Sequence, residues 1–241
     1  PLDDCYSALA WLHAQSARLG IDPARIAIGG ESAGGGLAAA LAIRVRDEGT
    51  YPVCHQHLTY PMLDDRTGTP ERFGDPLVGE FVWNRDNNRF GWSSYLGEHP
   101  AQAPYVPARV AQVDGLPPTW LFTVSLDLFR DENIAYAQRL LAAGIDTELV
   151  VMPGACHGFQ LLPNTSFSKR YVAAHCGSAL RALHDMQRHI RRGMRCVQCA
   201  ERSANGSAAT TATDTDRNSG PAATTATDTD RNSGPTKATR K

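Results

Sequence analysis

From residue 26 the sequence reads Ile26-Ala27-Ile28-Gly29-Gly30-Glu31-Ser32-Ala33-Gly34-Gly35-Gly36, a short apolar run that leads directly into a G-x-S-x-G pattern. The apolar run predicts a buried strand, and the Ala- and Leu-rich residues 37–45 predict a buried helix. A G-x-S-x-G between a strand and a helix is typical of a tight turn that strains the backbone of its serine, here Ser32. We expect Gly30 and Gly34 to be required, because a side chain at either position would collide with the neighbouring strand or helix.

Further strands and helices alternate along the chain. Strands are predicted at residues 26–28, 54–60, 119–124 and 147–152, and helices at 37–45, 131–143 and about 166–190. Upstream of them, Asp3 or Asp4 can cap a helix that ends at Gly20. Strands that alternate with helices form parallel βαβ units with right-handed crossovers. We therefore predict an open, mostly parallel α/β sheet with helices on both faces.

The predicted turn exposes the hydroxyl group of Ser32. It lifts this group above the carboxyl ends of the strands, where open α/β sheets bind ligands. It also places the group at a helix N-terminus, whose free N–H groups favour developing negative charge. The first of these N–H groups belongs to Ala33, which is therefore a candidate oxyanion-hole donor.

A serine hydroxyl is a weak nucleophile until a base accepts its proton, so a histidine and an orienting carboxylate should lie nearby. Asp127 follows the predicted strand at 119–124, and His157 follows the one at 147–152. Loops after successive parallel strands open on the same edge of a sheet, so Ser32, Asp127 and His157 can converge there. Asp131 is the competing carboxylate, but it precedes an apolar-periodic helix and is interpreted as its N-cap.

These residues belong to segments that resemble the hormone-sensitive-lipase-like group of bacterial esterases, often called family IV, within the α/β hydrolases. The resemblance covers about residues 1–185. The matching segments are 2–6 with Trp11, 20–27, 30–35, 60–62, 115–118, Asp127 with 130–132, and 157–159. The resemblance implies the α/β-hydrolase fold, with Ser32 as nucleophile, Asp127 as acid and His157 as base. It further implies hydrolysis of small-molecule carboxylic esters with short to medium acyl chains, and no cofactor.

Members of that family also carry a His-Gly-Gly-Gly motif whose backbone N–H groups form most of the oxyanion hole. No His-Gly-Gly occurs in this sequence. The resemblance therefore implies an N-terminally truncated chain that lacks the first strands and the cap. Such a chain should have little activity by itself, because losing one oxyanion donor costs about 2.7 to 4 kcal/mol. The strand at 26–28 should then be an exposed edge of the sheet.

Two other functions remain open. A catalytically silent homologue could keep the pocket and bind a small ligand, although such relatives usually lose the histidine that His157 represents. A serine peptidase on the same fold would use the same triad and oxyanion hole, so the residues alone do not separate ester from amide cleavage. The aromatic residues of segment 64–105 either line an acyl or alcohol pocket or belong to a helical excursion that packs them on the sheet.

Composition excludes several classes of partner. The net charge is −1, from 24 Lys and Arg against 25 Asp and Glu, which offers no basic surplus for nucleic acid or an anionic membrane. No apolar run approaches the roughly 18 residues that a membrane span needs. The chain contains 6 cysteines, and reduced thiols in a cytoplasmic protein are the preferred interpretation. Cys196-x-x-Cys199 lacks the further ligands of a zinc site, so we expect no metal.

The sequence changes character towards its end. Residues 208–221 recur unchanged as residues 222–235, and no side chain after Cys199 is more apolar than Ala, Pro or Thr. Such a segment buries too little apolar surface to offset its backbone entropy, about 1 to 2 kcal/mol per residue. We therefore predict a partial catalytic domain at 1–190 and a disordered low-complexity tail at 191–241. Oligomeric state is left open, with a homo-oligomer possible.

Overall fold

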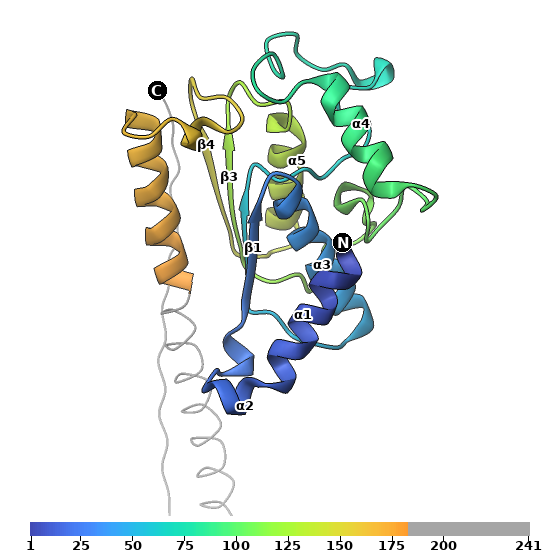
Figure 1. The fold of residues 1–241 in the computed structure, drawn as a ribbon, viewed down its shortest axis with the longest axis vertical. Coiled ribbons are helices and arrows are strands. Elements are labelled where there is room, and N and C mark those ends of the chain that lie inside the picture. Colours follow the sequence, from blue (N-terminus) through green and yellow to red (C-terminus); the bar gives the residue numbers. More distant parts are fainter. Residues whose placement is uncertain (183–241) are drawn as a thin grey trace, which may run out of the picture. The chain divides into compact units, whose positions relative to one another are not determined.

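Four parallel strands form a sheet in the order β1-β2-β3-β4 in the computed structural model, which describes residues 1–182. They are β1 (Ala27–Glu31), β2 (His55–Thr59), β3 (Thr119–Val124) and β4 (Thr147–Met152). Their register aligns Gly30 with Leu58, Leu58 with Leu121, and Leu121 with Leu149. All carboxyl ends therefore lie at one edge of the sheet (Figure 1), and the predicted α/β architecture is confirmed.

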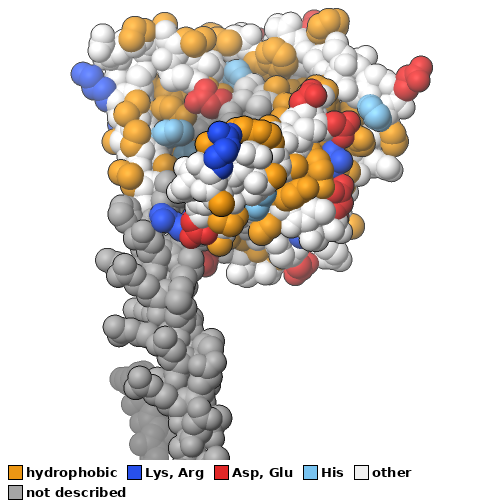
Figure 2. Space-filling model, turned by 60° about the horizontal axis from the view of Figure 1, so that its bottom comes forward, with side chains coloured by type: hydrophobic (Ala, Val, Ile, Leu, Met, Phe, Trp, Pro, Cys, Tyr) orange, Lys and Arg blue, Asp and Glu red, His pale blue; other side chains and the backbone are white. Residues whose placement is uncertain are grey.

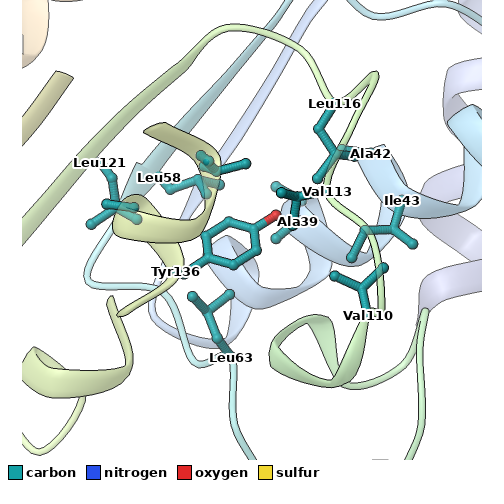
Figure 3. Packing of buried hydrophobic residues seen from close by; sticks show 13 residues of the cluster. Ala39, Ala42, Ile43, Leu58, Leu63, Val110, Val113, Leu116, Leu121 and Tyr136 are labelled. Atoms are coloured by element: carbon teal, nitrogen blue, oxygen red, sulfur yellow. The ribbon is translucent and has the colours of Figure 1, made fainter. Parts of the chain in front are cut away.

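Helices cover both faces of this sheet. On one face, α3 (Ala33–Glu48) and α5 (Arg130–Ala142) share a buried cluster with the strands. Figure 3 shows the ring of Tyr136 of α5 between Leu58 and Leu121 of the strands and Ala39 of α3. On the other face, the helical segment 166–182 packs through Tyr171 against aromatic residues of β3. The end of the last predicted helix, and the whole predicted tail, lie outside the described residues.

The first helical segment differs from the prediction in its start and its continuity. It consists of α1 (Leu2–Ala14) and α2 (Ser16–Leu19), which are separated at Gln15. Pro1 occupies the N-cap position, and Asp3 and Asp4 lie in the first turn of α1, so neither aspartate caps it as predicted. Carboxylates in a first turn still favour the helix by charge, without the side-chain hydrogen bond. The predicted end at Gly20 is confirmed, with a left-handed φ of 66°.

The long connection between β2 and β3 contains a helix, in agreement with the interpretation of segment 64–105 as a helical excursion. It is α4 (Arg85–Leu96), preceded by η2 (Pro70–Arg72) and followed by η3 (Pro107–Arg109). Asn84 caps α4 by accepting a hydrogen bond from the N–H of Asn87 (2.9 Å). The helix contains asparagine, serine and glycine, which have low helix propensity. Its buried Trp92 packs in a cluster with Met62 and Phe129, so tertiary contacts determine this helix.

β1 has a strand neighbour on one side only within residues 1–182, as the predicted edge strand should. Its residues alternate between exposed and half-buried positions. No helix among these residues is long and apolar enough to cross a membrane. On the face shown in Figure 2, acidic and basic side chains are interspersed among hydrophobic ones.

Glu132 ties α5 to the segment that follows β2. Its Oε1 accepts hydrogen bonds from the N–H groups of Leu63 (2.6 Å) and Asp64 (3.3 Å), and its Oε2 accepts one from the hydroxyl of Thr67. The side chain is buried, and this burial raises the pKa of Glu132 well above its usual range. The carboxyl group therefore takes up a proton more readily in the folded chain than in the unfolded chain.

The contribution of Glu132 to stability should consequently fall as pH rises. A raised pKa in the folded state stabilises the fold below the unfolded pKa, and this contribution is lost as pH rises through the folded pKa. We expect the free energy of unfolding, measured by urea denaturation between about pH 5 and 8, to decline less steeply in Glu132→Gln. The control Glu98→Gln changes an exposed carboxylate and should leave the slope unaltered. Equal slopes in E132Q and the parent chain would contradict the raised pKa.

Replacing Gly34 or Gly36 of α3 by alanine should change the free energy of unfolding in opposite directions. A Cβ at position 36 would lie 2.2 Å from the carbonyl oxygen of Met62, whereas one at position 34 would meet no atom within 4 Å. We expect Gly36→Ala to lower the free energy of unfolding by about 1 to 3 kcal/mol through overpacking. Gly34→Ala should raise it by about 0.5 to 1 kcal/mol, because alanine loses less entropy in a helix. Urea midpoints of the two variants check both signs.

Candidate active site

Ser32 lies in a sharp turn between β1 and α3. Its φ of 55° and ψ of −123° form a positive-φ conformation that surrounding structure must enforce. The Ser32 N–H donates to the carbonyl oxygen of Thr59 (3.0 Å), and the Ser32 carbonyl oxygen accepts from the N–H groups of Met62 and Gly36 (each 3.0 Å). The sheet and the helix therefore hold the strained residue from two sides.

The glycines around Ser32 permit this turn, but not all as predicted. A Cβ at Gly30 would lie 2.4 Å from the carbonyl oxygen of Gly34, so no side chain fits there. The predicted collision at position 34 is wrong, because it is the backbone of Gly34 that fills the space beside Gly30. The close approaches missed by the sequence analysis are at Gly35, where a Cβ would lie 2.9 Å from Pro61, and at Gly36.

The structure brings Ser32, Asp127 and His157 together. The Nε2 of His157 lies 3.0 Å from the Oγ of Ser32, and its Nδ1 lies 2.7 Å from the Oδ2 of Asp127. The other carboxylate oxygen of Asp127 accepts the N–H of Phe129 (3.0 Å). An ionised carboxylate is an acceptor only, so the imidazole proton belongs on Nδ1. Nε2 is then free to accept the proton of the Ser32 hydroxyl.

Aromatic rings enclose the imidazole of His157. Ring centroids lie 4.5 Å away for Tyr60, 5.4 Å for Phe129 and 6.3 Å for Trp83. His157 and Asp127 are both almost completely buried. Water is therefore excluded from the hydrogen bond between them, which strengthens that bond and fixes the ring.

Asp131 does not contact His157, and its predicted capping role is also wrong. Phe129 holds the N-cap position of α5 and makes no side-chain cap bond. Asp131 lies in the first helical turn, where its Oδ1 accepts a hydrogen bond from Nε of Arg130 (2.7 Å). Asp127 lies in the loop between β3 and α5, whereas Asp131 lies within the helix. Of the two carboxylates, Asp127 is the one that hydrogen-bonds His157.

Ala33 is the first residue of α3, as the strand–turn–helix prediction required. The first N–H groups of a helix have no acceptor within the helix, and the helix dipole makes this end positive. With Ser32 at the N-cap, its hydroxyl oxygen lies at this positive end.

No sequence pattern predicted that Val82 and Trp83 would lie beside His157. Val82 has a φ of 65°, and the N–H of Trp83 donates to the carbonyl oxygen of Phe81 (2.7 Å), which makes a very tight turn. Positive φ is strongly disfavoured for a β-branched residue, so no propensity rule predicts it. A Cβ at Gly158 would lie 3.5 Å from Cγ1 of Val82, which places this turn beside His157.

Within residues 1–182, the other candidate ligand residues do not assemble into a site. No group of three or more His, Cys, Asp or Glu side chains that could hold a metal ion occurs among residues 1–182. His55 and His57 share a face of β2, with ring centroids 5.7 Å apart. Cys5, Cys54, Cys156 and Cys176 are free thiols. Cys196 and Cys199 lie outside the described residues.

Comparisons with known proteins identify several esterases and a receptor as similar chains. Carboxylesterase NlhH of Mycobacterium tuberculosis is 33% identical over 161 residues, covering 66% of this chain and 50% of that protein. The gibberellin receptor GID1 of Oryza sativa subsp. japonica is 34% identical over 174 residues, covering 68% and 48%. The solved structure of a bacterial heroin esterase superimposes with a TM-score of 0.69 at 44% identity, covering 76% and 59%.

The chain spans about half the length of the curated relatives that it matches. A family model for the α/β hydrolase fold matches residues 1–161. Together with the carboxylesterase relatives, this match confirms the resemblance to the hormone-sensitive-lipase-like group, and the chain belongs to the α/β-hydrolase fold family.

Proposed function

We propose that this chain carries the catalytic centre of a serine hydrolase that cleaves carboxylic esters. The observation that carries the proposal is the continuous hydrogen-bonded path from Ser32 through His157 to Asp127, at 3.0 and 2.7 Å. The esterase names of several relatives support the choice of esters over amides.

In the proposed mechanism, Ser32 Oγ attacks the ester carbonyl carbon while His157 Nε2 accepts its proton. Asp127 stabilises the imidazolium that forms. The N–H of Ala33 and the positive end of α3 stabilise the oxyanion of the tetrahedral intermediate. His157 then protonates the leaving alcohol, which leaves an acyl group on Ser32. Water, deprotonated by His157, hydrolyses this acyl-enzyme.

The proposed substrates are small-molecule esters with short to medium acyl chains. Support comes from the family resemblance and from the exposed apolar side chains of Phe81, Val82 and Leu161 around the loop of His157. A cytoplasmic location is proposed from the free thiols among residues 1–182. Pairing of β1 with a second copy of the chain is proposed as a route to a homo-oligomer, because β1 has a strand neighbour on one side only within residues 1–182.

A second candidate is a ligand-binding homologue without catalysis. The gibberellin receptor relatives favour it, since similar chains include proteins named as receptors. The intact contact between Ser32 and His157 argues against it, because binding alone does not need an aligned nucleophile and base. Ligand binding without any covalent labelling of Ser32 would support the receptor function.

The nucleophile is tested by Ser32→Ala. We expect the chain to react covalently with a fluorophosphonate probe, because this reaction needs a single attack by Ser32 and no turnover. Ser32→Ala should abolish the labelling, because no oxygen remains to attack. Intact-mass spectrometry and peptide mapping locate the adduct. Labelling that persists in the S32A variant would refute the assignment of Ser32.

The orienting carboxylate is tested by Asp127→Asn, with Asp131→Asn as its matched control. An amide in place of Asp127 favours the wrong tautomer of His157, and in serine proteases this change lowers kcat on the order of 10⁴-fold. We expect a loss of similar size in the rate of probe labelling. Asp131→Asn alters an exposed aspartate near the same loop and should leave the rate unchanged. A larger loss of labelling rate in D131N than in D127N would make Asp131, and not Asp127, the orienting carboxylate.

A further inference from the structure

Glu31, the residue directly before Ser32, connects the turn of the serine to the loop of the histidine. Its Oε2 accepts a hydrogen bond from Nε2 of Gln160 (2.8 Å). Gln160 belongs to η4 (Phe159–Leu161), which begins two residues after His157. One carboxylate at the end of β1 therefore reaches the segment that carries His157.

The second carboxylate oxygen of Glu31 accepts a hydrogen bond from the segment that covers the face of the sheet opposite α3 and α5. Oε1 accepts a hydrogen bond from the hydroxyl of Tyr171 (2.7 Å), in the helical segment 166–182. The same hydroxyl lies 3.1 Å from Oγ1 of Thr59 and 3.3 Å from Nδ1 of His175. Burial, together with the hydrogen bond to Glu31, raises the pKa of Tyr171 above its usual range, so the hydroxyl keeps its proton.

The Tyr171 ring is fixed by packing. It is buried between Phe122 of β3 and Phe159 of η4, with ring centroids 5.0 and 5.5 Å away. Its hydroxyl therefore has a defined position against the ends of β1 and β2. A donor that is already fixed loses little entropy when it binds Glu31, and a bond to a carboxylate is stronger than a neutral one.

Such a connection matters because β1 is held by a neighbouring strand on one side only within residues 1–182. The tip of β1 carries Ser32, whose backbone contact with β2 is the hydrogen bond to Thr59. The distance between Ser32 Oγ and His157 Nε2 depends on both segments, and a displacement of about 1 Å at a reacting group can cost about 10²-fold in rate.

We propose that Glu31 is a positioning residue, which holds the Ser32 turn and the His157 loop at hydrogen-bonding distance through Tyr171 and Gln160. This inference rests on the proposed hydrolase function. It differs from a purely structural role, in which Glu31 would only fasten the helical segment 166–182 to the sheet.

The test compares Glu31→Ala, Glu31→Gln and Tyr171→Phe in the full chain. The readouts are the limiting rate of fluorophosphonate labelling at saturating probe, the probe concentration at half saturation, and the melting temperature. Glu31→Ala should lower the limiting rate about 10- to 100-fold, without a matching change in half saturation. Glu31→Gln keeps an acceptor for Tyr171 and should recover most of the rate. Tyr171→Phe removes only the hydroxyl and should fall between them.

Tyr136→Phe is the matched control. Tyr136 is also a buried tyrosine, but it lies in the cluster on the opposite face of the sheet. Its loss of a hydroxyl should leave the labelling rate unchanged whatever it does to the melting temperature. In the Glu31→Ala background, Tyr171→Phe should lower the labelling rate by a smaller factor than it does in the parent chain, because the two residues act through one contact.

Three results would overturn the inference. The first is an unchanged limiting rate in Glu31→Ala while the parent chain is labelled at Ser32, which leaves the proposed function intact. The second is a loss of rate that follows melting temperature equally in all variants, Tyr136→Phe included. The third is a parent chain that is not labelled at Ser32, which overturns the proposed function as well.

Discussion

The positive φ of Ser32 is the constraint on which the rest of the site depends. Such a conformation persists only where its surroundings stabilise it, and here the stabilising groups come from β2, from the segment after it and from α3. The close approach of α3 to Met62 requires a glycine at position 36. Strand, turn and helix are thus mutually dependent, and together they determine the backbone conformation of Ser32.

The parallel sheet places the other two residues of the site beside this turn. Asp127 and His157 follow β3 and β4 at the same edge, and burial makes their hydrogen bond short and directional. Asp127 accepts one hydrogen bond from the imidazole and another from the backbone of Phe129, so both its oxygens have partners. The charge that His157 would gain during the reaction is matched by a carboxylate already held in place.

The features that could be predicted from sequence are those with a local or topological cause. Apolar runs predicted the strands, glycines predicted the turn, and parallel order predicted that Asp127 and His157 would meet Ser32. The features that were missed or left open depend on packing between distant segments. Helix α4 has weak intrinsic propensity and forms because Trp92 is buried, and Val82 adopts a positive φ that its side chain disfavours. The predicted N-cap residues of α1 and α5 were wrong because several neighbouring residues could start each helix.

The contacts around the serine join parts of the chain that are far apart in sequence. Ser32 and His157 are separated by 125 residues, and Glu31 and Tyr171 by 140. Contacts between residues so far apart in sequence form late in folding, because a long loop must close at a cost in entropy before the contact stabilises the chain. A partly folded chain can therefore contain β1 and α3 without an aligned base beside Ser32. Reactivity of this serine would then report on the completed fold, and intermediates on the way to it would be chemically inert.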